Sequence, residues 1–436
     1  MSNVLVLIVL FVLALPASAA AQHVHDPSQQ SAEPVGMAAM FPPREASGTA
    51  WVPDFTPMYG LHRQAGDWWL MLHWNVFGQF LYESGDDHRS GSQAGSINWV
   101  MGMARRPLGA GRLGFRLMAS VDPWTIGDCG YPNLLATGEM CDGDTIHDRQ
   151  HPHDLFMEVA ADYERPINRS LRWQLYAGLS GEPALGPAAF PHRLSSMSNP
   201  VAPITHHWLD STHISFGVIT TGIQARQWKA EMSVFNGREP DENRADFDLA
   251  KLDSVSGRFT WLPSKELALQ FSMAHLEEAE EEFAPEPRTD VDRTTASVTY
   301  HRPVGGNGSW ASLLAWGMNS HIEIVPGATL DLTTHALLLE SAYSLRNRHN
   351  WFGRFEVVGK PAHDLHAHEF ATRVFTVGKV QGGYELTLPA WRGLVTGVGG
   401  TFSVSLLPED LAVRYDGRVA PGFGVFVSLR PTRHIM

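Results

Sequence analysis

The feature that most constrains this chain is a period-two alternation of apolar and polar residues that recurs along most of its length. From Leu155 to Tyr163 every second residue is apolar, while Glu158 and Asp162 lie between them. The same pattern runs from Arg112 to Asp122 and from Leu171 to Ser180. Successive side chains of a β-strand point to opposite faces, so this period with one apolar face predicts a strand. Sixteen segments show it, and the other thirteen begin near Trp68, Ser96, His213, Trp228, Ser254, Leu267, Arg293, Trp310, Thr334, Trp351, Phe370, Leu394 and Val419.

The connections between these segments are alternately short and long. Alternation alone would also fit a soluble β-sandwich, because a sandwich likewise hides one face of each sheet. Short turns on one side and long loops on the other are typical of outer-membrane barrels. In such barrels an even strand number puts the start of the first strand and the end of the last strand on the short-turn, periplasmic side. The expected long loops are 84–95, 123–153, 181–212, 236–253, 277–292, 319–333, 360–369 and 407–418.

Amphipathic aromatic residues provide a second test of the membrane interpretation. A barrel that faces lipid carries girdles of Trp and Tyr at the two membrane interfaces. Seven such residues lie within a few positions of a short turn and in phase with the apolar face of their strand, namely Tyr163, Trp173, Trp228, Trp261, Tyr300, Tyr343 and Trp351. This coincidence of position and facing favours lipid outside the ring of strands.

Three stretches carry a resemblance to known proteins. DRQHPHDLFMEVAADYERP, HHWLDSTHISFGV and FNGREPDENR resemble segments of a family of Gram-negative outer-membrane β-barrel proteins with porin-like architecture. The resemblance implies a shared barrel and supplies no catalytic residues to carry over. We therefore predict an all-β fold, a transmembrane antiparallel barrel of about sixteen strands, in the outer membrane of a Gram-negative bacterium.

The domain boundaries follow from the same reading. Residues 1–21 have the apolar core and small-residue end of a secretory signal peptide. Residues 22–66 are expected to form a periplasmic or lumenal segment, and 67–436 the barrel. Cys129 and Cys141 are the two cysteines of the chain, and in an exported protein we expect them to form a disulfide that staples a loop without strand structure.

The expected partners are outer-membrane lipid, the barrel-insertion machinery and small solutes. The final alternating segment, GFGVFVSLRP, resembles the terminal strand by which outer-membrane barrels are recognised for insertion, although TRHIM follows where an aromatic end is usual. A net charge of −13 without a basic stripe argues against nucleic-acid binding. The sequence leaves the oligomeric state open.

The polar phase of the strands should line the barrel interior. In a barrel of this size side chains cannot fill the lumen, so water is expected there unless loops or the N-terminal segment enter it. The expected inward residues are of mixed charge and include Arg112, Arg116, Asp154, Glu158, Asp162, Arg172, Arg258, Arg293, His301, Glu340, Arg354 and Glu356.

Histidine is abundant, with 21 residues, and gathers on the expected outer loops. Imidazole beside carboxylate can bind a divalent metal such as zinc or copper, although these spacings match no closed site that we can name. The alternative is that the histidines hydrogen-bond within compact loops. The candidate ligands are His147, His151, His153, His206, His207, Asp210 and His213.

Three functions remain open from the sequence. The first is a passive channel or surface binding barrel for small solutes, with no cofactor required. The second is metal-ion binding or transport through the loop histidines. The third is a barrel-embedded lipid-modifying hydrolase built on Ser211, His213 and Asp210, which as near neighbours on an extended segment could not all converge without a partner from another loop.

Overall fold

The computed structural model describes residues 44–85, 89–127, 129–280, 288–325, 328–370 and 373–433, which all belong to one compact unit, Met37–Met436. The predicted signal peptide and the first part of the predicted N-terminal segment lie outside these residues.

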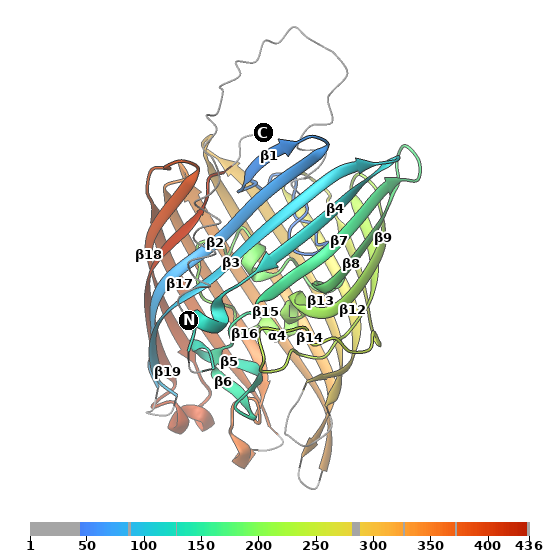
Figure 1. The fold of residues 1–436 in the computed structure, drawn as a ribbon. Helices are drawn as coiled ribbons and strands as arrows, with labels where there is room; N and C mark the ends of the chain where they lie inside the picture. Colours follow the sequence, from blue (N-terminus) through green and yellow to red (C-terminus); the bar gives the residue numbers. More distant parts are fainter. Residues whose placement is uncertain are drawn as a thin grey trace. The chain divides into compact units, whose positions relative to one another are not determined.

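In the described part of the chain, sixteen antiparallel strands close into a ring (Figure 1). Each pairs with the next ring strand along the chain, and β19 pairs with β2 to complete the closure. The predicted all-β barrel is therefore confirmed. The ring strands are β2 (Trp68–Glu83), β3 (Gly91–Leu108), β4 (Gly111–Ala119), β7 (Phe156–Pro166), β8 (Arg172–Gly181), β9 (Ser215–Gln224), β10 (Trp228–Phe235), β11 (Ser254–Trp261), β12 (Leu267–Glu280), β13 (Thr289–Val304), β14 (Gly308–Val325), β15 (Ala328–Leu345), β16 (His349–Pro361), β17 (Val374–Thr387), β18 (Leu394–Leu406) and β19 (Val419–Pro431).

The remaining elements lie outside the ring order. β1 (Leu61–Ala65) pairs with the first residues of β2, and β5 pairs with β6 in a separate hairpin. Short helices occur in the longer connections. These elements are β5 (Tyr131–Cys141), β6 (Asp144–Gln150), α3 (Asp122–Thr125), α4 (His206–Leu209), η1 (Phe190–His192), η2 (Ser211–His213), η3 (His368–Phe370) and η4 (Glu409–Arg414).

Two local predictions were wrong. The expected long loop 319–333 is mostly strand, because β14 continues to Val325 and β15 begins at Ala328. The segment between the two cysteines is not free of strand structure either, since it forms β5. Its pairing with β6 is irregular, and Leu135 and Glu139 have positive φ, which explains why period two is absent from its sequence. The predicted disulfide between Cys129 and Cys141 is present.

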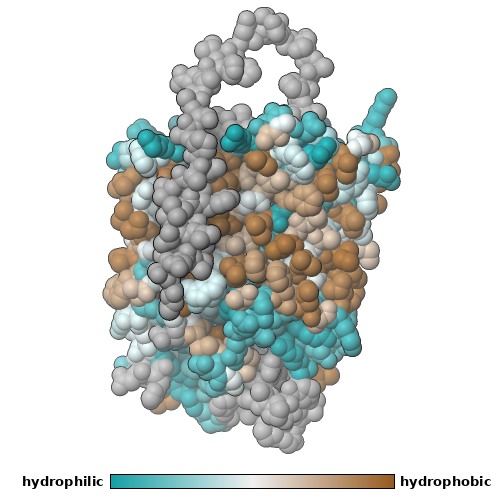
Figure 2. Space-filling view, in the orientation of Figure 1, coloured by the Kyte–Doolittle hydropathy of each residue, from teal (hydrophilic) through white to brown (hydrophobic). Residues whose placement is uncertain are grey.

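The apolar phase of the strands points outward. Phe115, Leu117 and Val425 are each about half exposed, while the alternate residues between them are buried. Figure 2 shows the resulting hydrophobic band across the strands, with hydrophilic residues at its short-turn rim and more broadly toward the long loops. Among the described residues, no helix is long and apolar enough to cross a membrane.

The aromatic residues near the short turns form cross-strand pairs. Trp228 lies opposite Trp261, and Trp351 lies opposite both Tyr343 and Tyr384. The ring centroids of Tyr343 and Trp351 are 6.2 Å apart, and those of Trp351 and Tyr384 are 5.6 Å apart. The strand register therefore assembles single aromatic residues into a girdle at one end of the apolar band.

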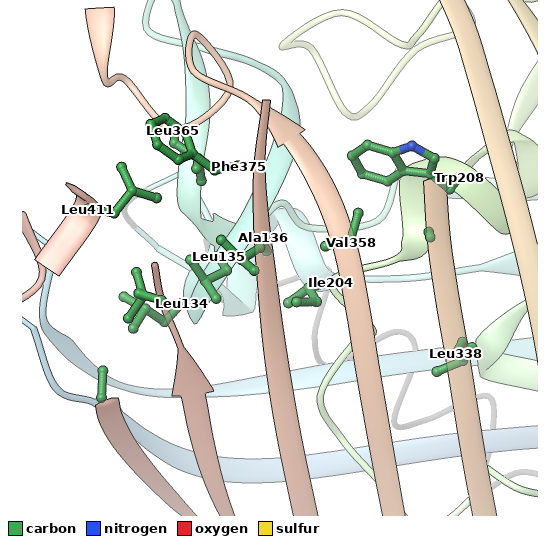
Figure 3. Close-up of a cluster of buried hydrophobic side chains, with 14 of the residues drawn as sticks. Leu134, Leu135, Ala136, Ile204, Trp208, Leu338, Val358, Leu365, Phe375 and Leu411 are labelled. Atoms are coloured by element: carbon green, nitrogen blue, oxygen red, sulfur yellow. The ribbon is translucent and has the colours of Figure 1, made fainter. Parts of the chain in front are cut away.

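Apolar residues also occur on part of the inner wall, where loops cover them. A buried cluster joins Leu134 and Leu135 of β5, Trp208 of α4, Leu338 of β15 and Val358 of β16 (Figure 3). Loop residues thus pack against the inside of the ring. This packing places the β5–β6 hairpin and the loop between β8 and β9 against β14–β17.

Candidate functional site

The loop 182–214, between β8 and β9, extends across the interior to the opposite wall. Ser195 Oγ donates a hydrogen bond to Glu340 Oε1 (2.7 Å) in β15, and Ser198 Oγ donates to Glu385 Oε2 (2.6 Å) in β17. Arg193 Nε donates to the same Glu340 Oε1 (2.7 Å). These buried contacts fix the loop inside the ring, where a free loop would remain hydrated.

The described end of the N-terminal segment contacts the nearer wall. Arg105 Nη2 donates to Glu45 Oε2 (2.6 Å), and Arg112 Nη2 donates to Glu45 Oε1 (3.0 Å). Burial alone would raise the pKa of Glu45, but the surrounding arginines lower it well below its usual range. Farther along, Arg258 Nη2 donates to Thr49 Oγ1 (2.9 Å). Residues 44–52 therefore lie against wall residues of the polar phase.

Most of the expected inward residues are buried in mutual ion pairs or against these two segments. Arg172, the first residue of β8, is exposed at the short-turn rim. Asp154 precedes the first residue of β7, so it belongs to the outer loop and not to the wall, and it faces Arg244 Nη1 at 3.6 Å. Asp162 is partly buried. The buried wall residues are Arg112, Arg116, Glu158, Arg258, Arg293, His301, Glu340, Arg354 and Glu356.

Five of the candidate histidines and Asp210 come together where loop 182–214 meets the β6–β7 connection. The ring centroids of His206 and His207 are 5.4 Å apart, and His151 lies 6.2 Å from each of them. His213 lies 5.2 Å from His206 and 5.6 Å from His153. Histidines more than fifty positions apart in the sequence thus form one buried imidazole cluster, because both loops fold into the same part of the interior.

The Nδ1 atom of each ring faces an oxygen. His206 Nδ1 hydrogen-bonds to Asp210 Oδ1 (2.9 Å), and His213 Nδ1 to the Asp210 carbonyl oxygen (2.9 Å). In the remaining pairs the acceptor is a carboxylate that sequence reasoning did not connect with histidine. These pairs are His153 with Asp122 (2.7 Å) and His207 with Glu239 (2.9 Å). His151 Nδ1 hydrogen-bonds to the Pro152 carbonyl oxygen (3.1 Å) and also lies 3.1 Å from Glu139 Oε2.

This arrangement leaves the Nε2 atoms of the cluster available. A neutral imidazole that donates through Nδ1 carries its lone pair on Nε2, which is the orientation found in metal ligands held by a carboxylate. In the described structure, Nε2 of His151, His207 and His213 is buried without a hydrogen-bond partner. Burial and neighbouring positive groups hold the pKa values of His151 and His213 well below the ordinary range, so both rings are neutral.

Close approach of the backbone fixes His207 in this cluster. Gly138 of β5 has φ +113°, and a Cβ at this position would lie 2.2 Å from His207 Cε1. Glycine is the residue that tolerates both the conformation and the contact. Ligand atoms of His207, Glu239 and Glu280 also lie within 4.8 Å of one another.

The structure does not bring His147 into this cluster. Its Nδ1 lies 3.0 Å from Asp148 Oδ2. The ring centroids of His147 and His366 are 4.1 Å apart, and the two rings are tilted by 45°. Asp148 Oδ2 also accepts a hydrogen bond from Arg89 Nη1 (2.7 Å). His147 therefore helps to hold the β5–β6 hairpin against the neighbouring loops.

The hydrolase candidates are not arranged as a nucleophile, base and orienting acid. The Asp210 carboxylate hydrogen-bonds to His206 and accepts a hydrogen bond from Arg193 Nη1 (2.5 Å). His213 hydrogen-bonds to the backbone oxygen of Asp210 and not to its carboxylate. Ser211 Oγ accepts a hydrogen bond from Arg293 Nη1 (2.9 Å). Asp210 thus supports a different histidine and an arginine.

Comparison of the whole fold with solved structures agrees with this architecture. An anion-selective porin from Comamonas acidovorans matches with a TM-score of 0.50 at 11% identity, over 83% of this chain and 99% of that chain. The fold is that of a porin. Two further matches have lower TM-scores. They are the outer membrane channel DcaP of Acinetobacter baumannii (TM-score 0.47, 10% identity, 86% of this chain and 100% of that chain) and OmpT of Vibrio cholerae (TM-score 0.47, 8% identity, 85% and 100%). No protein-family model and no curated protein matches the chain.

Proposed function

We propose that this porin-fold barrel is a narrow passive channel of the outer membrane for small solutes. The observation that carries the proposal is loop 182–214, which enters a lipid-facing barrel and anchors on the opposite wall at Glu340 and Glu385. A loop held across a barrel divides the lumen and sets the size of what passes. The N-terminal residues around Glu45 narrow it further from the other side.

The free space beside these segments is small. A cavity of about 140 Å³ lies between Glu45, Arg105, His73 and His192. This space holds several water molecules, so it suits hydrated ions and other small solutes. The substrates that we propose are therefore small hydrated ions.

Planar-bilayer recording tests the channel. Wild-type protein should show small conductance steps. Glu45→Gln should enlarge them and shift the reversal potential in a salt gradient toward anion preference, because the negative charge that Arg105, Arg112 and Arg116 share is then removed. Glu409→Gln, in an exposed loop helix, is the matched control and should behave like wild type. Folded protein that gives silent bilayers in all three forms would contradict the proposal.

A metal-binding function is the second candidate, and the buried Nε2 atoms favour it. Three histidines with oriented Nδ1 atoms and unpartnered Nε2 atoms provide nitrogen donors of the kind that zinc and copper(II) bind. The rings of His151, His206 and His207 are close enough for side-chain rotation to bring them onto one ion. Acidic Glu239 and Glu280 beside His207 would balance the charge of a divalent cation.

Dialysis followed by metal analysis tests this site. Protein loaded with zinc should retain stoichiometric metal, and the variant His151→Ala/His206→Ala/His207→Ala should lose it. His349→Ala, at the short-turn end, is the control and should retain it. Equal retention by the triple variant would exclude the cluster as the ligand set.

A further inference from the structure

Sulfur-containing side chains form a continuous patch on the inner wall of β2, β3 and β4. Met71 of β2 lies opposite Met103 of β3 in the strand register, and His73 lies opposite Met101. Met101 in turn lies opposite Met118 of β4. Directly opposite residues of antiparallel strands have neighbouring side chains, so four thioethers and one imidazole share one surface.

The inserted segments bring further donors to this patch. His192, in η1 of loop 182–214, places Nε2 3.3 Å from Met118 Sδ. Met197 of the same loop and Met58 of the N-terminal segment line the cavity of about 140 Å³ that borders Met71, Met101 and Met103. Residues from three distant parts of the chain therefore surround one internal space with thioether and imidazole groups.

His73 has an unused donor in this surface. In the described structure its Nε2 atom is buried and makes no hydrogen bond. Its ring centroid lies 5.9 Å from that of His192, and the indole of Trp99 lies 5.2 Å from His73 and 4.8 Å from His192. An unpartnered buried nitrogen is costly, and His73 lines this cavity, so a ligand in the cavity would give the nitrogen a partner.

Methionine often fills irregular gaps in a protein core, and this role must be weighed against a site. A filling role predicts close packing without residual space, and it does not explain a histidine without a partner. Here a cavity remains among the methionines, and the imidazoles of His73 and His192 also line it. Both observations favour a binding site.

The charge around the cavity selects the kind of ion. Glu45 is already engaged by Arg105, Arg112 and Arg116. The available donors are thus uncharged, and the nearby arginines oppose a second positive charge on the ion. Thioethers are soft ligands, which select copper(I) over zinc.

We propose that Met71, Met101, Met103 and Met118, together with His73 and His192, form a lumenal site for a soft monovalent cation of the copper(I) class. This site differs in place and chemistry from the imidazole cluster around His206. It goes beyond the channel function and stands whether or not bilayers conduct.

Silver(I) is a suitable probe, because it is monovalent, soft and not oxidised by air. Folded full-length barrel in detergent is incubated with silver(I), passed through a desalting column and analysed for metal. Wild type should retain a single tight ion per chain at this site. The variant Met71→Leu/Met101→Leu/Met103→Leu/Met118→Leu should lose it, since leucine keeps the volume and removes the sulfur.

Two controls separate this site from other effects. Met232→Leu/Met273→Leu removes two thioethers on the lipid-facing surface and should leave silver retention unchanged. His151→Ala/His206→Ala/His207→Ala should also retain silver(I), whereas loss of silver in that variant alone would assign it to the imidazole cluster and overturn the proposal.

Selenomethionine-labelled barrel provides a readout that does not need a folded variant. With copper(I) or silver(I) bound, absorption at the selenium edge should show a metal neighbour at bonding distance. Absence of that neighbour, or full silver retention by the four-leucine variant, would refute the site.

Discussion

At the scale of single residues, the interior is governed by charges removed from water. A buried ionised group needs a partner, and loop 182–214 begins with such a group, Glu182. Burial raises the pKa of Glu182 to about 8, although Arg258 Nη1 at 3.6 Å from Oε1 acts in the opposite direction. Gly48 of the N-terminal segment packs on the same side chain, since a Cβ there would lie 2.6 Å from Glu182 Cβ. One carboxyl group thus touches both inserted segments and the wall.

Glu182 should make the stability of the barrel pH-dependent. Its folded-state pKa lies above its ordinary value of 4.5, so the folded protein binds the proton more tightly. The resulting stabilisation is complete below about pH 4.5 and is lost as the pH rises toward 8. Urea unfolding midpoints in detergent across this range should decrease less for Glu182→Gln than for wild type. Glu409→Gln, in an exposed helix, should follow wild type; an equal slope in all three would contradict the assignment.

At this scale, the sequence predicted facing and could not predict partners. Alternation predicted Glu340 and Arg354 for the inner face, because facing depends only on strand phase, and both are buried in the structure. That Glu340 would bind Ser195 and Arg193 of a distant loop depends on where the loop folds, which no local pattern encodes. The carboxylate partners of the histidines escaped prediction for the same reason.

At the scale of elements, Arg193 is the main anchor of loop 182–214. It donates to Asp210 within the loop and to Glu340 on the wall, and all three groups are buried. Both carboxylates form ion pairs with this guanidinium. Burial alone would raise the pKa of Asp210, but Arg193 helps to lower it below its usual range. Arg193 therefore joins the loop to the wall alongside the hydrogen bonds of Ser195 and Ser198.

Arg193→Met should destabilise the folded barrel by about 3–5 kcal/mol, because it leaves the buried Asp210 without its guanidinium and the buried Glu340 with Arg354 alone. Arg373→Met removes an exposed pair with Asp410 and should cost only about 0–1 kcal/mol. Unfolding free energies from urea titration in detergent give both values. A loss of under about 1 kcal/mol for Arg193→Met would mean that the loop is held by its apolar contacts instead.

The outward face of the strands yields a prediction of different origin. Leu339 of β15 points outward between the aromatic girdle and the long-loop end. Leu339→Arg should reduce the stability in lipid by about 2–4 kcal/mol, as expected for a cation near the middle of the bilayer. Val413→Arg, in the exposed loop helix η4, should have no such effect. Refolding equilibria in phospholipid vesicles measure the difference; equal stability would place Leu339 outside the lipid-facing band.

Strands that face lipid on one side were predictable from their alternating pattern, whereas elements inside the barrel were less predictable. All sixteen ring strands were located, because each must alternate between lipid and interior. β5 was missed because it packs between loop residues and the inner wall, so Leu134 and Leu135 are both buried and no alternation results. The extension of β14 to Val325 was missed because turn residues there were read as a loop.

At the scale of the whole molecule, the ring and its contents are built from different parts of the chain. The wall is made by neighbouring strands, whereas the contacts inside it join residues that are far apart in sequence. Ser195 precedes its partner Glu340 by 145 positions, and Ser198 precedes Glu385 by 187. These two contacts therefore cannot form before the last third of the chain has taken its place in the ring.

This separation dictates an order of assembly. The segment that fills the barrel is synthesised and delivered before the surface on which it rests exists, so it must wait, hydrated, until β15–β17 have joined the ring. A protease added during refolding should cut between residues 182 and 214 at early times and lose access once β19 has met β2. Closure of the ring and burial of loop 182–214 should then occur together, and protease resistance of the loop should appear at the same time as the closed barrel.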